Sequence, residues 1–314
     1  MNASCTICGA SSNSRTIDVR GNKRMGIYHC EICDFDFFVN DPTKGLADDK
    51  LDESRLKSAG LDIPSIEKDF ANGIKQSQHY METLVDESDK GKNILEIGCS
   101  VGYFLQLLKD YGAIPYGVEL NLGRTQYVNE HLGIPCFETL EKCEAKQIKF
   151  KKIFLFYVLE YIPDPVNYFK RLINMLEEGG SIIVISPNLD DFLKDGWQNP
   201  GFNKFFYDEF AINYFTVKAT RRFAELIPVK NFDLYTKQGY SFLNHTSWYL
   251  TNAPRTTGIV GGDTFLDNVV ELFRTSPVSF KEDMITLINK FDSEYKKIIE
   301  ANDFGNRIYL ILNK

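Results

Sequence analysis

The 314-residue sequence has only four histidines and two tryptophans, and it lacks any apolar run near the roughly 18 residues that a membrane-spanning helix needs. Its opening residues, MNASCTICGA, lack the basic and apolar segments of a secretory signal. We therefore expect a cytoplasmic protein that does not enter a membrane. The small number of imidazoles also leaves few candidates for a general base.

An excess of positive charge is also missing, since 36 Lys and Arg stand against 43 Asp and Glu, for a formal net charge of -7. A chain of this charge has no overall electrostatic attraction to nucleic acid, although a local basic patch is compatible with it. Hydrophobic residues make up 43% and charged residues 25%, which is typical of a soluble globular protein. The length predicts one major core with a small appendage.

Four of the seven cysteines form two C-x-x-C pairs, Cys5 with Cys8 and Cys30 with Cys33. Without a secretory signal, such pairs indicate a metal site more than disulfides, because intracellular thiols stay reduced. Four thiolates at this spacing can surround a zinc ion, and a closed site of this kind is structural. The sequence therefore predicts a zinc ribbon over residues 1–40, with a redox or disulfide role as the alternative. A linker and leading helices are expected over 41–90.

From residue 93 onward, short apolar runs alternate with helical patterns. Strands are expected at 93–97, 114–120, 134–138, 152–162 and 181–188. The helices predicted between them span 101–112, 122–133 and 165–180. Strands that alternate with helices of this length imply a doubly wound parallel sheet in an α/β fold.

The sequence changes character after Asn188. Residues 189–216 are rich in aromatic side chains and are expected to form an irregular lid over a pocket. A helix is predicted at 216–227 and strands at 232–237 and 241–250. Helical spacing recurs over 262–301, and this segment is expected to form either a substrate cap or a dimer surface. The alternating segment 307–314 is expected to return to the sheet as a strand.

A glycine turn follows the strand at 93–97, and two acidic residues accompany it, one before the turn and one at the end of the next strand. Glu96, Gly98 and Gly102 lie at the strand-to-helix junction, and Glu119 ends the second strand 21 residues after Gly98. In an open parallel sheet, ligands bind at the carboxyl ends of the strands, and an acid at about this spacing binds ribose hydroxyls. The dinucleotide pattern requires a glycine at the position of Ser100, so no pyrophosphate is implied and a nucleoside is favoured. For the same reason a dehydrogenase is disfavoured.

The segment LEIGCSVGYF resembles motif I of the class I S-adenosylmethionine-dependent methyltransferases, and YVLEYIPDP and LEEGGSIIVISPN resemble later segments of that family. The resemblance implies a Rossmann-like class I methyltransferase sheet over 91–314, with the ribbon at its amino end and a helical insertion near its carboxyl end. It implies S-adenosylmethionine as cofactor. The predicted cofactor contacts are Glu96, Gly98, Cys99, Gly102, Phe104, Glu119, Leu120, Leu155 and Tyr157.

The ribbon, the core and the run Tyr214-Phe215-Thr216 together resemble bacterial methyltransferases of sugar and polysaccharide biosynthesis. This resemblance implies a sugar or nucleotide-linked sugar as acceptor. The Glu-His pair of the C-methylating members is replaced here by Glu209-Phe210, so O- or N-methylation is favoured.

A hydroxyl acceptor needs a general base. The first candidate is His245, on the strand expected at 241–250, followed by Glu160 and Tyr161. Further candidates are Tyr207, Asp208 and Glu209. Two other functions stay open: an RNA methyltransferase, which the basic residues of the ribbon favour, and a scaffold that binds the cofactor without catalysis.

Overall fold

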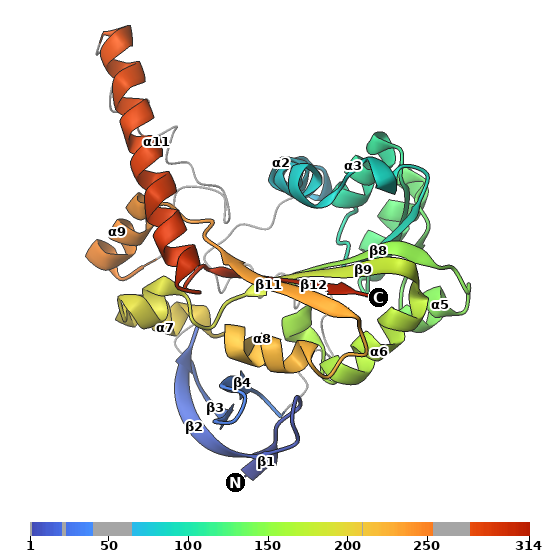
Figure 1. Cartoon of the computed structure of the whole chain (residues 1–314), viewed down its shortest axis with the longest axis horizontal. Helices are drawn as coiled ribbons and strands as arrows, with labels where there is room; N and C mark the ends of the chain where they lie inside the picture. Colours follow the sequence, from blue (N-terminus) through green and yellow to red (C-terminus); the bar gives the residue numbers. More distant parts are fainter. Residues whose placement is uncertain (1, 21–22, 40–64, 209, 254–276) are drawn as a thin grey trace.

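The computed structural model describes residues 2–20, 23–39, 65–208, 210–253 and 277–314. The described chain forms a large sheet covered by helices on both faces, and a smaller sheet at its amino end (Figure 1). Part of the predicted linker, at 41–64, and part of the predicted insertion, at 262–276, lie outside the described residues, as does Glu209.

The large sheet has seven strands in the order β11-β12-β9-β8-β5-β6-β7. The pairs joining β9, β8, β5, β6 and β7 are parallel, whereas β12 runs antiparallel to both β9 and β11. The strands are β5 (Asn93–Ile97), β6 (Ile114–Val118), β7 (Cys136–Phe137), β8 (Phe150–Phe156), β9 (Leu176–Pro187), β11 (Asn231–Lys237) and β12 (Arg307–Asn313). The predicted doubly wound α/β fold is confirmed, and the last segment returns to the sheet as expected.

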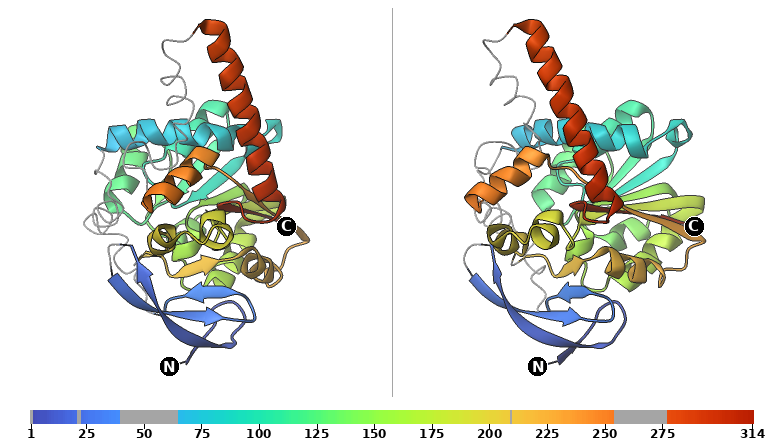
Figure 2. Two further views of the ribbon diagram at one scale, coloured as in Figure 1. Left: turned by 90° about the vertical axis from the view of Figure 1, so that its left-hand side faces the viewer. Right: turned by 60° about the vertical axis from the view of Figure 1, so that its left-hand side comes forward.

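Each face of this sheet has its own apolar core, because the central strands are apolar on both sides. Figures 1 and 2 show the helices as two layers with the sheet between them. One layer holds α2 (Ile66–Leu84), α3 (Tyr103–Tyr111), α4 (Leu122–Tyr127) and the π-helical turn η3 (Val128–Leu132). The other holds α5 (Leu140–Glu144), α6 (Pro165–Met175) and α8 (Val217–Ala224).

The amino-terminal sheet is completed by a strand from far along the chain. Its order is β1-β2-β3-β4-β10, and β10 pairs antiparallel with β4. Its strands are β1 (Asn2–Ser4), β2 (Ser11–Val19), β3 (Lys23–Cys30), β4 (Phe35–Phe37) and β10 (Asn213–Phe215). Backbone hydrogen bonds between β4 and β10 therefore join the ribbon to the segment that follows β9.

That segment was expected to be an irregular lid, and this is wrong in part. It contains the π-helical turn η5 (Phe192–Gly196), helix α7 (Pro200–Phe206) and β10. Asp36 in β4, which has no exposed surface, accepts hydrogen bonds from Tyr207 at 2.6 Å, from His29 at 2.8 Å and from Arg15. The segment is thus bound to the ribbon by a buried carboxylate as well as by backbone pairing.

The strand predicted at 241–250 is also wrong, because this stretch forms helix α9 (Phe242–Thr251). The Ser241 side chain accepts from the Asn244 amide and caps the helix, and His245 and Trp248, three residues apart, lie on its buried side. The aromatic and β-branched residues of this stretch favour a strand locally, but burial of one helical face prevails.

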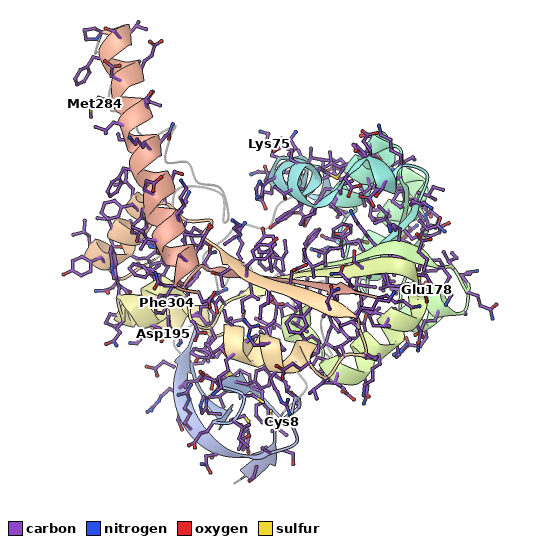
Figure 3. All side chains as sticks on the ribbon, viewed as in Figure 1. Cys8, Lys75, Glu178, Asp195, Met284 and Phe304 are labelled. Carbon is purple, nitrogen blue, oxygen red and sulfur yellow. The ribbon has the colours of Figure 1, made fainter. Side chains whose placement is uncertain are left out.

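The helical spacing predicted for the late segment is confirmed where it is described, since α11 spans Val278–Ala301. The amino-terminal half of α11, with Met284, extends away from the sheets (Figure 3). None of the described helices combines the length and the apolar character that crossing a membrane requires.

Candidate functional site

The glycine turn predicted from the sequence lies at the carboxyl end of β5 and leads into α3. Gly98 and Gly102 have φ values of +72° and +79°, and Gly102 is the residue before the first turn of α3. A Cβ on Gly98 would lie 2.5 Å from Cγ2 of Val158. Ser100 between them also has a positive φ, +50°. Both glycines are therefore required by their backbone conformation and by the side chains packed against them, and the turn lies at the carboxyl end of β5, where ligands of an open parallel sheet bind.

Glu119, just beyond β6, lies against this turn as the sequence predicted. Its carboxylate accepts hydrogen bonds from the Ser100 amide at 3.0 Å and from the Asn121 amide at 2.8 Å. Glu119 is partly buried, and the adjacent Leu120 is 47% exposed. A carboxylate and an apolar side chain thus lie side by side at the carboxyl end of β6, which suits a ribose and the base attached to it.

Glu96 lies beneath the turn and is only 3% exposed. Desolvation, with contributions from Cys136 and Glu119, raises the pKa of Glu96 well above its ordinary value. Its Oε2 atom has no hydrogen-bond partner among the described residues. A buried oxygen of this kind calls for a donor group, and the ammonium end of an amino acid bound at the turn is such a donor.

Tyr157 directly follows β8 and has a φ of +56°, an unusual backbone conformation for a bulky residue. It is 37% exposed, and its hydroxyl lies 3.4 Å from the hydroxyl of Tyr80 on α2. The Tyr80 ring stacks on Phe156 at 4.6 Å. Sequence reasoning selected Tyr157 but missed Tyr80, because α2 lies between the cysteine pairs and the glycine turn and carries no motif of its own.

The four paired cysteines come together in the ribbon. Their sulfur atoms all lie within 4.8 Å of one another, and the Sγ atoms of Cys8 and Cys30 are 3.7 Å apart. A zinc tetrahedron with bonds of about 2.3 Å has sulfur–sulfur edges of about 3.8 Å. Cys5, Cys30 and Cys33 are buried and Cys8 is partly exposed (Figure 3 labels Cys8). The donor set therefore fits a zinc ion.

Comparison with known families agrees with the position of the glycine turn. The model of a family described as a methyltransferase domain matches residues 72–228, which is half of the chain. The chain belongs to this family. The matched range contains the glycine turn, Glu119 and Tyr157, so these residues are part of the methyltransferase domain.

Individual relatives match over shorter lengths. A ubiquinone biosynthesis O-methyltransferase from Coxiella burnetii is 26% identical over 105 residues, which is 32% of this chain and 45% of that protein. The protein of the same name from Glaesserella parasuis is 28% identical over 110 residues, 31% of this chain and 46% of its own length. The match thus spans less than half the length of these curated relatives.

One solved structure that resembles the chain is a SAM-dependent methyltransferase from Archaeoglobus fulgidus. It is 15% identical, with a TM-score of 0.49, and the similarity covers 84% of this chain and 99% of that chain.

Three predicted cofactor contacts of the methyltransferase domain lie below its surface. Phe104 and Leu155 have no exposed surface, and Cys99 is 1% exposed. Phe104 packs edge-on against Phe154 and Phe156, with ring centroids 5.1 and 5.0 Å away. These side chains support the turn from within the core, so only their backbone can face a bound molecule.

His245 was expected on a strand facing the substrate, and its surroundings differ from that expectation. It has no exposed surface, its Nε2 pairs with the Gln238 side-chain nitrogen at 3.1 Å, and its Nδ1 pairs with the Tyr295 hydroxyl at 2.7 Å. Burial lowers the pKa of His245 to about 4. Both ring nitrogens are engaged within the protein, which disfavours a role as general base.

We expect His245 to act on stability and not on the pH dependence of the reaction. Because its pKa is lower in the folded state than the unfolded value of about 6.5, the unfolded chain takes up the proton first as pH falls. The stability that neutral His245 contributes at pH 7 is lost as pH falls from 6.5 towards 4. The loss in the free energy of unfolding between pH 7 and pH 4.5 is about 2 to 3 kcal/mol. Urea unfolding at pH 7 and 4.5 measures it as the difference between wild type and His245→Asn.

The exposed His79 on α2 provides the matched control. His79→Asn should show the same loss between pH 7 and 4.5 as the wild type. If His245→Asn instead removed an ionisation from the pH profile of kcat without changing the pH dependence of unfolding, the structural role would be wrong.

The other candidate bases of the methyltransferase domain lie in two segments, the turn that follows β8 and the residues that follow α7. Glu160 and Tyr161 belong to the short turn η4 (Leu159–Tyr161), which begins two residues after Tyr157. Glu160 is 6% exposed and Tyr161 is partly buried. The Tyr207 hydroxyl is engaged by Asp36, and the Asp208 carboxylate accepts from two backbone amides. Of these candidates, Glu160 and Tyr161 stay closest in sequence to the strand end that carries Tyr157.

Proposed function

We propose that this methyltransferase domain binds S-adenosylmethionine at the β5 and β6 ends and methylates a small molecule. The observation that carries the proposal is the meeting of the glycine turn with Glu119, above a buried Glu96 oxygen that has no described partner. When bound, S-adenosylmethionine would supply a methyl group on a positively charged sulfur, so that direct displacement moves the methyl group to the acceptor and leaves the sulfur as a neutral thioether. Family membership supports the proposal.

The chain's own residues would hold and align the reactants. Glu96 and the backbone of Gly98 suit the amino-acid end of the cofactor, Glu119 suits the ribose hydroxyls, and Leu120 suits the base. Displacement depends mainly on alignment and on a deprotonated acceptor atom. We propose that Glu160, with Tyr161 beside it, accepts the proton of a hydroxyl acceptor, because His245 is engaged elsewhere.

The proposed acceptor is a sugar or a nucleotide-linked sugar, methylated on oxygen or nitrogen. The name of the relatives, ubiquinone biosynthesis O-methyltransferase, supports oxygen as the acceptor atom. RNA is the alternative acceptor, and the net charge of -7 argues against it. We also propose that the cysteine cluster binds zinc as a structural ion.

Isothermal titration of the zinc-loaded protein with S-adenosylhomocysteine tests the cofactor site first. Binding at micromolar concentration would support it, and a panel of sugars, nucleotide-linked sugars, phenols and RNA would then be assayed for methyl transfer. RNA methylation that falls steeply with salt would replace the small-molecule proposal. A folded sample that binds no S-adenosylhomocysteine would refute the enzymatic proposal and favour the scaffold.

A further inference from the structure

Arg307 lies at the same edge of the sheet as the glycine turn, although no motif marks it. It is the first residue of β12 and pairs with Pro187 at the end of β9. Because β12 is antiparallel to β9, its amino end meets the carboxyl ends of the parallel strands. Side chains alternate along a strand, so Arg307 lies on the same face as Tyr309, which belongs to the core beneath α2 and α3.

Four tyrosines lie near enough to Arg307 for an electrostatic interaction, and the side chain of Tyr309, two residues along β12, is hydrogen-bonded to it. The tyrosines that interact with its charge are Tyr157, Tyr80, Tyr240 and Tyr309. The first two place their hydroxyl oxygens 3.4 Å apart. Desolvation raises the pKa of Tyr157 well above its ordinary value, so its phenol is neutral and can donate a hydrogen bond. A cation and several hydroxyl donors are thus gathered at one place.

The backbone of Gly239 lies against the same guanidinium. A Cβ at Gly239 would lie 2.9 Å from Nη2 of Arg307 and 3.0 Å from its Cζ. This close approach depends on the absence of a side chain at Gly239, which lies two residues after the end of β11.

Arg307 has no acidic partner within the described ranges. It is only partly exposed, and the ion pairs found for described arginines involve other residues, namely Arg15, Arg24, Arg171 and Arg222. A partly desolvated charge without a counterion is unfavourable. The planar guanidinium group can donate two parallel hydrogen bonds to a carboxylate or a phosphate, which makes these anions its preferred partners. The missing counterion is therefore expected to arrive with a ligand.

We propose that Arg307, with the hydroxyls of Tyr80 and Tyr157, binds an anionic carboxylate or phosphate group of the methyl acceptor. The proposal rests on the proposed function and narrows its substrate class to acidic molecules. The strand order separates β12 from β5, whose end carries the glycine turn proposed for the amino-acid end of the cofactor, by three strand spacings, or about 14 Å. That separation favours the acceptor over the carboxylate of the cofactor as the source of the anion.

The test titrates the S-adenosylhomocysteine-loaded protein with inorganic phosphate and with acetate. Wild type should bind at least one of these anions, and Arg307→Gln should bind it at least about tenfold more weakly. Arg221→Gln, at an exposed arginine of α8, is the matched control and should bind as wild type does. In methyl-transfer assays, Arg307→Gln should raise KM for an acidic acceptor much more than it changes kcat.

Thermal unfolding provides a second readout that requires no acceptor. In phosphate-free buffer, Arg307→Gln should raise Tm by about 2–4 °C, because it removes a partly buried charge without a counterion. A lower Tm would show that the chain itself satisfies Arg307, and would overturn the proposal. Unchanged anion affinity in Arg307→Gln, or no anion binding by wild type, would also overturn it.

The two proposals fail in different ways. If wild type does not bind S-adenosylhomocysteine, the proposed function itself is wrong. If wild type binds it and Arg307→Gln loses that binding while keeping its affinity for phosphate, Arg307 serves the cofactor, and only the acceptor proposal is overturned.

Discussion

Glu119→Ala is expected to weaken binding of S-adenosylhomocysteine by at least about 100-fold. Hydrogen bonds to a charged group contribute about 1.5–3 kcal/mol each, and a ribose offers two hydroxyls to this carboxylate. Losing both removes about 3 kcal/mol or more, and each 1.4 kcal/mol is a factor of ten in Kd. Isothermal titration at constant pH and salt measures the change.

The same substitution also removes the acceptor of the Ser100 and Asn121 amides. Glu119→Gln separates the two effects, because its amide oxygen can still accept a backbone hydrogen bond while the charge is gone. Glu178→Ala is the matched control, since the Glu178 side chain is 82% exposed and lies away from the turn (Figure 3). Unchanged affinity in a folded Glu119→Ala protein would contradict the assignment of the ribose to Glu119.

The large sheet was predictable from sequence because its information is local. Each central strand is a continuous apolar run, as in Ile153 to Leu155 of β8, and each is followed by a turn residue and a helix. The glycine turn and Glu119 were found for the same reason, since the fold fixes their spacing within one β-α-β unit. The clustering of the four cysteines was predictable because two tight C-x-x-C pairs are the spacing that suits a tetrahedral metal site.

The remaining features depend on contacts that the local sequence does not encode. The stretch that forms α9 has the residues of a strand, and only the burial of His245 and Trp248 decides for the helix. The three residues of β10 become a strand because the ribbon offers an open edge. Arg307 could have been suspected from its position alone, since a strand that returns antiparallel begins where the parallel strands end.

Replacing Cys30 with serine is expected to release the proposed zinc ion and to unfold the ribbon together with β10. A structural zinc ion contributes about 10–16 kcal/mol to the folding of small domains, and a segment of about 40 residues buries too little apolar surface to fold without such support. Hydrogen exchange should therefore become fast in the ribbon and in residues 213–215, whose backbone pairs with Phe35 to Phe37. The amides of β5 and β8 should keep their protection.

The metal content and the exchange pattern should change together. Cys143→Ser is the matched control, because Cys143 is fully buried on α5 and lies outside the cluster, so its variant should retain zinc and the protection of β10. Loss of zinc with β10 still protected would mean that the buried Asp36 network holds the ribbon in place by itself. Loss of both the zinc and the protection of β10 would mean that the metal holds the segment after β9 in place. That segment contacts the proposed base through the hydrogen bond from the Ile212 amide to the Glu160 carbonyl.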